Sequence, residues 1–367
     1  MFAGDGRNPG VSPVLDDQVD RLLDRALSMA PAVRCTYDIG AQRIAVNYLS
    51  EELHARLHPA LEHLAIAADD PPTLTIIAQA SKSPPLQLTN QQWTTTCQRW
   101  SKSEIPQEDT LSANFTPGDG GRLDLIMPAR RVALSSFRNV NLIPAWDMAT
   151  PFRDLLHQWF RKHDGHLIHG AVVADGQSAV VLAGTYRAGK SSTAFACLRH
   201  SRLECLGDDV FLARKIGSEW HAFSLYNACK LLPHDVGRFT HNLVPLDDSV
   251  RGDGKPTFYL YPAFADRLPG QRRLAAILLP RITGKSETAF SPAKPGETWR
   301  ALVPSTLALT PASPEGIAWL TTLARHMPSW WLDIGTDREA IPPRIAELIH
   351  LAGQRGLAAQ PPKGYAS

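Results

Sequence analysis

The sequence predicts an α/β protein with a mixed sheet, and three observations lead to this fold class. Residues 179–183 form an apolar, strand-like run that is followed by a Gly-rich loop and a helix to about His200. Asp175-Gly176 separates this run from an earlier one and is a strong hairpin signal, so the two strands are expected to be antiparallel. Strand-like and helical patterns then alternate to residue 351.

Composition and length fit a globular protein of two domains. The chain has 367 residues, of which 44% are hydrophobic and 20% charged. A net charge of +2 gives no broad electrostatic footprint for nucleic acid or membrane. The N-terminus lacks a signal-peptide core, and no apolar run could span a bilayer. The five scattered cysteines contain no C-x-x-C pair, which indicates buried thiols in a reducing compartment. We therefore expect a cytoplasmic protein, and its oligomeric state, including a homo-oligomer, stays open.

Residues 15–143 are expected to form a smaller α+β domain after a flexible leader, residues 1–14. The patterns predict helices at 17–29 and 58–67, strand signals at 36–46, and strands at 73–78, 123–127 and 132–137. The polar stretch 80–122 gives few apolar runs. This domain contains no chemical motif, and we expect it to serve in docking or scaffolding for a peptide.

Three histidines, His54, His58 and His63, follow one another at near-helical spacing. A metal site is conceivable there, but no carboxylate or cysteine pattern accompanies them. The sequence favours solvated histidines on a helix face.

Residues 144–351 are expected to form the second domain, before a flexible tail at 352–367. An amphipathic helix at 152–162 begins it, with apolar residues spaced at i, i+3, i+4 and i+7. The later patterns predict strands at 167–174, 178–183, 203–206, 274–279 and 330–334, and helices at 191–200, 317–327 and 342–351.

Gly184, Gly189, Lys190 and Ser191 fit the phosphate-loop pattern G-x-x-x-x-G-K-[ST], with the strand before and the helix after that it requires. Backbone N–H groups of such a loop and the helix N-terminus bind a polyphosphate. Lys190 is expected on the β- and γ-phosphates and the Ser191 hydroxyl on Mg²⁺. The whole expected phosphate-binding segment is Gly184, Thr185, Tyr186, Arg187, Ala188, Gly189, Lys190, Ser191 and Ser192. The alternative is a Gly-rich connector without a ligand.

A pair of carboxylates follows the next strand. Asp208 and Asp209 come eighteen and nineteen positions after Lys190, where a P-loop enzyme keeps its Mg²⁺-ordering aspartate. One could hold metal while the other accepts a proton from an attacking hydroxyl. An Asp-rich turn is the alternative for an isolated pair.

The segment HLIHGAVVADGQSAVVLAGTYRAGKSSTAFACL together with LECLGDDV resembles the HPr kinase superfamily. The further segments SLYNACKL (224–231), ILLPR (277–281) and LVPST (302–306) are similar to the HPr-kinase-like enzymes of lasso-peptide biosynthesis. The similarity covers about residues 145–350, with a looser match at 58–64. It implies a fold akin to phosphoenolpyruvate carboxykinase and the phosphorylation of a serine hydroxyl with ATP and Mg²⁺. The implied partner is a ribosomal precursor peptide, whose C-terminal serine is the acceptor.

The resemblance also implies a role for each residue of the site. Asp208 is the general base, His169 orients or polarises that base, and Lys190 stabilises charge on the phosphoryl group. Ser191 and Asp209 hold Mg²⁺, although spacing alone does not settle which aspartate is base and which is ligand. The resemblance implies that Lys230 contacts phosphate or substrate; a solvated lysine at the rim is the alternative. A lone histidine on an apolar strand is more often a core residue, and the adjoining Gly170 favours the catalytic interpretation of His169.

One position departs from the superfamily. Arg187 stands where a small residue, commonly Gly, is usual, so the loop is expected to use an ordinary backbone conformation there or to offer an arginine to the γ-phosphate. A nucleotide-responsive binding module without catalysis is the first alternative function, and a small-molecule kinase is the second. No segment matches the phosphorylase-specific part of HPr kinases, so dephosphorylation is not expected.

Overall fold

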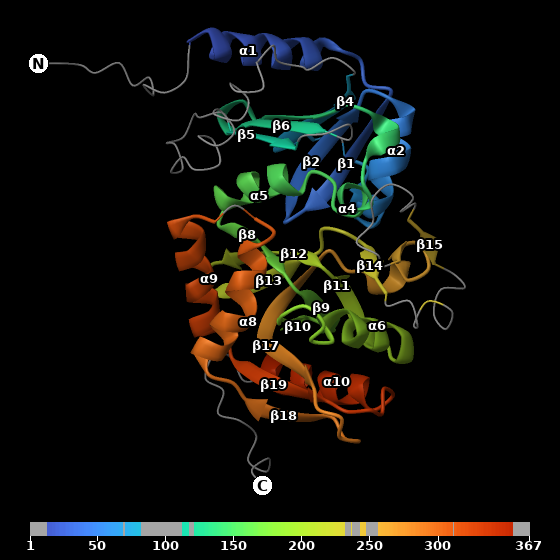
Figure 1. Ribbon diagram of the computed structural model, residues 1–367, viewed down its shortest axis with the longest axis vertical. Helices are drawn as coiled ribbons and strands as arrows, with labels where there is room; N and C mark the ends of the chain where they lie inside the picture. Colours follow the sequence, from blue (N-terminus) through green and yellow to red (C-terminus); the bar gives the residue numbers. More distant parts are fainter. Residues whose placement is uncertain are drawn as a thin grey trace, which may run out of the picture.

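The computed structural model describes residues 13–68, 70–81, 112–116, 121–231, 236, 243–246, 256–310 and 312–354. Two large sheets with helices packed on them form most of the molecule, and a small three-stranded sheet lies beside them (Figure 1). This is the mixed α/β architecture that the sequence predicts. None of the helices in the described ranges is long and apolar enough to cross a bilayer.

The N-terminal sheet has seven strands in the order β3-β1-β2-β4-β7-β6-β5. Its strands are β1 Val33–Ile39, β2 Gln42–Tyr48, β3 Ala65–Ile66, β4 Leu74–Ala80, β5 Ser112–Thr116, β6 Arg122–Met127 and β7 Val132–Phe137. Strand β4 is parallel to both of its neighbours, and the remaining pairs are antiparallel. The strand expected at 132–137 is confirmed with the same ends, and those expected at 73–78 and 123–127 are present with ends shifted by one or two residues.

The second sheet has nine strands, with the principal order β11-β9-β10-β17-β13-β12-β8 and β19 and β18 attached beyond β17. Its strands are β8 Gly165–His169, β9 Ala171–Asp175, β10 Ser178–Leu182, β11 Glu204–Gly207, β12 Val210–Ile216, β13 Glu219–Phe223, β17 Gln271–Ile282, β18 Ala289–Pro292 and β19 Ser329–Ile334. The small sheet contains β14 Ala228–Lys230, β15 Val244–Pro245 and β16 Thr257–Tyr259.

The strand before the phosphate loop, β10, is antiparallel to β9 across the Asp175-Gly176 turn, which confirms the expected hairpin. On its other side β10 is parallel to β17. The single strand expected at 167–174 is instead interrupted at Gly170, so that β8 pairs with β12 while β9 pairs with β10 and β11. At Gly170 the backbone of the neighbouring strand β10 lies very close: a Cβ at this position would be 3.0 Å from the carbonyl oxygen of Leu182.

Helices cover both faces of the second sheet (Figure 1). On β10, Val181 points to the layer of α8 and α9, whereas Val180 and Leu182 point to the layer of α6 and α10. This period of two is the pattern of a strand that is buried on both faces. The helices are α6 Lys190–His200, α8 Pro295–Leu307, α9 Pro314–His326 and α10 Ile341–Gln354.

The remaining helices belong to or follow the N-terminal sheet. Within the described residues they are α1 Pro13–Ser28, α2 Glu51–Leu57, α4 Ala145–Ala149 and α5 Arg153–Arg161, with short 3₁₀ helices at His58–Ala60, Glu62–Leu64, Pro128–Arg130 and Val140–Leu142. A further 3₁₀ helix, Ala265–Arg267, lies between β16 and β17. The helix expected at 58–67 is wrong: Pro59 starts a 3₁₀ turn, and β3 follows. Helix α1 begins inside the expected leader, and α10 continues three residues into the expected tail.

Several sequence-based expectations concern residues outside the described ranges. They are the leader before Pro13, most of the polar stretch 80–122, Cys97 and the tail after Gln354. Of the described cysteines, Cys197, Cys205 and Cys229 are buried, as expected for structural thiols, whereas Cys35 is only half-buried.

One hydrophobic core joins the two large sheets. It runs from Tyr37 and Ile44 of the N-terminal sheet through Phe160 of α5 to Leu212 and Tyr259 of the second half. Helix α5 presents its apolar side to this core, in agreement with its predicted amphipathic spacing. The N-terminal sheet and the phosphate-loop half therefore pack on common residues rather than through a polar linker.

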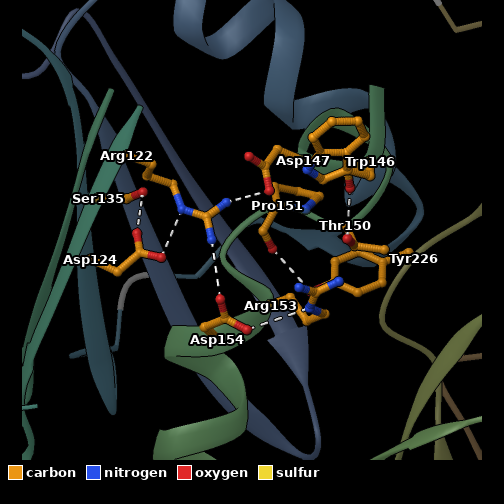
Figure 2. Close-up of polar contacts among 10 residues, drawn as sticks. All are labelled: Arg122, Asp124, Ser135, Trp146, Asp147, Thr150, Pro151, Arg153, Asp154 and Tyr226. Atoms are coloured by element: carbon orange, nitrogen blue, oxygen red, sulfur yellow. Dashed lines mark hydrogen bonds and ion pairs between the residues drawn. The ribbon is translucent and has the colours of Figure 1, made fainter. Parts of the chain in front are cut away.

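A buried ion cluster reinforces this junction (Figure 2). Arg122 of β6 donates to Asp124 on the same strand, to Asp147 of α4 and to Asp154 of α5. The arginine side chain is 4% exposed, and the three carboxylates are 1%, 8% and 9% exposed. Ser135 also donates to Asp124, and Arg153 pairs with Asp154. Charges removed from water this completely must be paired, so the cluster fixes α4 and α5 against the sheet.

Candidate nucleotide and phosphoryl-transfer site

The phosphate loop lies between β10 and the start of α6, as the motif requires. Gly189 is the N-cap of α6 with φ 98°, a left-handed conformation that favours glycine, and a Cβ there would lie 2.7 Å from Ile334. Lys190 begins the helix, and its Nζ donates to the carbonyl oxygens of Gly184 (2.8 Å) and Thr185 (3.1 Å). The lysine is 8% exposed, so its charge is held inside the curve of the loop.

The ordinary backbone conformation expected at Arg187 is wrong. Its φ is 65°, so this arginine adopts the left-handed conformation that a glycine would use at the same place. Its guanidinium lies 5.3 Å from the ring centroid of Tyr186, which is 65% exposed. The loop therefore keeps a glycine-like backbone path and presents an arginine and an aromatic ring at its tip.

The two aspartates occupy a break in an antiparallel ladder. Val210 is paired with His169, and Gly207 is paired with Val172, so Asp208 and Asp209 lie opposite the break at Gly170. The Gly170 N–H donates to the Asp209 carbonyl oxygen at 3.2 Å. Because regular pairing is interrupted in both of these segments, at Gly170 and at the two aspartates, the two carboxylates need not point to alternate faces of a flat sheet.

Asp209 lies between two basic side chains. Its Oδ1 is 3.2 Å from His169 Nε2, and its Oδ2 is 3.2 Å from Lys230 Nζ. Burial raises the pKa of the Asp209 carboxyl, but His169 and Lys230 outweigh burial and hold the pKa below its usual range. The side chain is 32% exposed, so an ionised carboxylate remains accessible from outside.

Asp208 is in a different environment. It is 5% exposed, and its Oδ2 accepts the backbone N–H of Lys230 at 3.0 Å. Its Oδ1 is buried and has no hydrogen-bond partner in the described ranges. Burial raises the pKa of Asp208 to about 6, although the Lys230 N–H and the Ser191 hydroxyl lower it. Burial of the Asp208 carboxylate is therefore only partly compensated, and the Ser191 hydroxyl in the first turn of α6 is one of the groups that stabilise its charge.

Small pockets adjoin Asp208, and one of them also adjoins Asp209. One is lined by Ser191, Ala194, Phe195, Leu198, Cys205, Asp208, Cys229, Leu231 and Leu260. The other is lined by Ala149, Thr150, Asp208, Asp209, Val210, Tyr226, Ala228, Lys230 and Thr257. Asp208 lines both pockets, so it lies between the pocket beside the start of α6 and the pocket beside Asp209 and Lys230.

The structure places His169, Asp208, Asp209 and Lys230 in one cluster, next to the loop that contains Lys190 and Ser191. His169 is implied to orient the base, and its Nε2 contacts Asp209, one of the two aspartates between which spacing leaves the base and ligand roles open. Lys230 is not a solvated rim residue, since it pairs with Asp209. Sequence reasoning did not find Thr306, whose hydroxyl accepts the His169 backbone N–H at 3.2 Å, although it lies in the LVPST segment.

The expectation for the three histidines also needs correction. All three are partly buried rather than solvated, and they do not act as one group. His63 hydrogen-bonds the Ser224 hydroxyl at 2.7 Å, whereas His54 and His58 stack on each other. The 3₁₀ turns after His58 direct His63 away from the other two.

Comparison with known proteins gives a structural similarity only. No protein-family model matches the chain, and no curated protein does. Among solved structures, it is similar to the HPr(Ser) kinase/phosphatase from Coxiella burnetii, at 11% identity and a TM-score of 0.28. The match covers 51% of this chain and 95% of that one. At these values, the function has to be argued from the site itself.

Proposed function

We propose that the chain is an ATP-dependent kinase that phosphorylates a serine hydroxyl. The observation that supports this most is the placement of an accessible, ionised carboxylate, Asp209, in the cluster that adjoins the phosphate loop. Phosphoryl transfer needs positioning and charge stabilisation more than covalent chemistry, and these residues supply both.

The chemistry of the donors fits a magnesium nucleotide. The loop offers backbone N–H groups, a buried lysine and the N-terminus of an eleven-residue helix, which together suit a polyphosphate. The Ser191 hydroxyl and the Asp208 carboxylate line one pocket, and both are oxygen ligands of the kind that Mg²⁺ prefers. When bound, Mg²⁺ would neutralise charge on the phosphate oxygens. We therefore assign Ser191 and Asp208 to the metal.

This assignment exchanges the roles that the sequence resemblance implies for the two aspartates. Asp209 is the proposed general base, since it is the more exposed carboxylate and His169 and Lys230 hold it in place. The serine oxygen attacks the γ-phosphorus, the bond from that phosphorus to the ADP oxygen breaks, and the serine proton passes to Asp209. Although the pKa of Asp209 is low, the serine hydroxyl becomes acidic as its bond to phosphorus forms, so a weak base suffices.

The two lysines have separate electrostatic tasks in this proposal. Lys190 stabilises negative charge on the phosphoryl group from inside the loop. Lys230 and His169 keep Asp209 ionised and fix its orientation, so they act through the base. Arg187, at the tip of the loop, is a further cation for the γ-phosphate side.

For the acceptor, we propose the C-terminal serine of a lasso-peptide precursor. The support is the sequence similarity of segments 224–231, 277–281 and 302–306, all of which adjoin the site or its sheet. Residues of 224–231 provide Lys230 and line the pocket beside Asp209, and Thr306 of 302–306 binds the His169 backbone.

Mass spectrometry of a peptide ending in serine, incubated with the protein and Mg-ATP, tests the proposal. We expect a single added phosphate on that serine, and none when the serine is replaced by alanine. Asp209→Asn should abolish transfer while ATP binding persists, and Asp208→Asn should weaken the binding of Mg-ATP. Asp266→Asn, at a side chain that is 83% exposed, is the matched control and should behave as wild type.

Binding of ATP without phosphate transfer to any serine peptide would favour the nucleotide-responsive module instead. Transfer to a small alcohol but not to peptides would favour the small-molecule kinase. Wild-type turnover by Asp209→Asn would refute the base assignment alone.

A further inference from the structure

Cys35, His54 and His58 come together in the N-terminal sheet, away from the phosphate loop in both sequence and sheet. One ligating atom from each residue lies within 4.8 Å of the corresponding atoms of the other two. All three residues are half-buried, and the two imidazole rings stack with centroids 4.5 Å apart and planes at 20°. A thiol and two imidazoles at this spacing have the composition of a transition-metal site.

Secondary structure holds the two histidines on one side of the same turn. His54 lies in α2, and the backbone N–H of His58, the C-cap residue, donates to the His54 carbonyl. A separation of four residues places both rings on one helix face, which is the arrangement that two zinc-binding histidines use on a helix. Ser50 caps the start of α2 by accepting the Leu53 N–H at 3.3 Å, so the helix has a fixed beginning.

The third group comes from a different element. Cys35 lies on β1, paired with Val46 of β2 in a regular antiparallel register. The strand therefore places the thiol independently of the helix, and the sequence gap between Cys35 and His54 conceals the grouping. This is why histidine spacing alone did not indicate a metal site.

A tyrosine hydroxyl contacts His58 in the way that a supporting group contacts a metal ligand. The Tyr37 hydroxyl is 2.7 Å from His58 Nδ1 and 2.9 Å from the Tyr48 hydroxyl. A hydrogen bond at Nδ1 fixes the ring orientation and directs Nε2 to another partner. Tyr48 also packs edge-on against His54, with centroids 5.2 Å apart.

We propose that Cys35, His54 and His58 bind a zinc-class divalent ion through the thiolate sulfur and one nitrogen of each imidazole, with water in the fourth position. Typical bonds of about 2.3 Å to sulfur and about 2.0 Å to nitrogen put ligand atoms roughly 3.3–3.7 Å apart in a tetrahedron. Small side-chain rotations bring atoms that already lie within 4.8 Å to this separation. The thiol proton is released to solvent when the ion binds.

Titration of the full-length, tag-free and chelator-treated protein with Co²⁺ tests the proposal. We expect one equivalent to bind, with a sulfur-to-cobalt charge-transfer band and the intense visible bands of tetrahedral Co²⁺, and Zn²⁺ should displace it. Cys35→Ser should lose the charge-transfer band, and His58→Ala should weaken binding at least about tenfold. His326→Ala, at an exposed histidine on α9, is the matched control and should bind as wild type.

X-ray absorption of the wild-type zinc complex provides a measurement that needs no variant to fold. One sulfur and two imidazole nitrogens in the first shell are expected. A first shell without sulfur, the absence of a charge-transfer band at one equivalent, or the same band in Cys35→Ser would overturn the proposal.

Discussion

Replacing Arg122 with Met should destabilise the protein severely, because the change leaves three buried carboxylates without their common cation. Arg122 is 4% exposed and binds Asp124, Asp147 and Asp154, none of which is more than 9% exposed. Removing one partner of a buried ion pair costs about 3–5 kcal/mol, whereas whole domains are stable by only about 5–15 kcal/mol. Since methionine fills much of the arginine volume, the loss is mainly electrostatic.

Urea unfolding followed by tryptophan fluorescence at pH 7.5 measures this loss. Arg130→Met is the control, because Arg130 pairs with Asp20 and Asp24 on the surface, where those carboxylates are 51% and 65% exposed. Its cost should stay under about 1 kcal/mol. A cost for Arg122→Met that is no larger than that of Arg130→Met would refute the electrostatic account of the cluster.

The pH dependence gives a second check on the same variant. Burial already raises the pKa of Asp124 to about 6 with Arg122 present, and without the arginine it should rise further. A carboxyl whose pKa is higher in the folded than in the unfolded state stabilises the fold as the pH falls. The penalty for Arg122→Met should therefore be smaller at pH 5 than at pH 8.

Three further predictions concern the phosphate-loop half. The pKa of Asp208 is raised from 3.8 to about 6, so the stability that its protonated carboxyl contributes is lost as the pH rises from about 4 to about 6. In thermal unfolding, Asp208→Asn should therefore be more stable than wild type by up to about 3 kcal/mol at pH 7.5 and show no gain near pH 4. Gly170→Ala should lower the free energy of unfolding in urea by about 1–3 kcal/mol and reduce phosphate transfer, because the new Cβ would lie 3.0 Å from the Leu182 carbonyl oxygen. An unchanged unfolding free energy and transfer rate would show that the two strands can separate there. Arg187→Gly should raise the free energy of unfolding by up to about 1 kcal/mol, because glycine adopts a φ of 65° without strain. A decrease would show that contacts of the arginine side chain stabilise the fold by more than the backbone strain costs.

Local patterns predicted much of the fold. The Asp175-Gly176 hairpin, the strands at 73–78 and 274–279 and helix α5 follow from turn chemistry and periodicity. The interruption at Gly170 could not be foreseen in the same way, because it depends on the distance to Leu182 in a neighbouring strand. The common core of the two halves is also invisible locally, since amphipathic spacing shows that α5 is buried but not against which sheet.

For the candidate site, the sequence identified the residue types but not their partners. Motif spacing located Lys190, Ser191 and the aspartate pair, whereas the contact of His169 with Asp209 depends on the side-chain arrangement of the folded protein. Residue type misled at Arg187, because the surrounding loop imposes a left-handed backbone on a non-glycine residue. It also misled at His54 and His58, which are half-buried rather than solvated.

The shared core constrains how this chain can be synthesised. Its members extend to Tyr259, whereas the last strand of the first sheet ends at Phe137, so this sheet cannot complete its packing until the next 122 residues have been synthesised. At about 5–20 residues per second, that delay is roughly 6–24 s, during which apolar strand faces stay open to misassociation. Chaperone dependence during translation, rather than slow folding of the finished chain, is the expected consequence for expression in a foreign host.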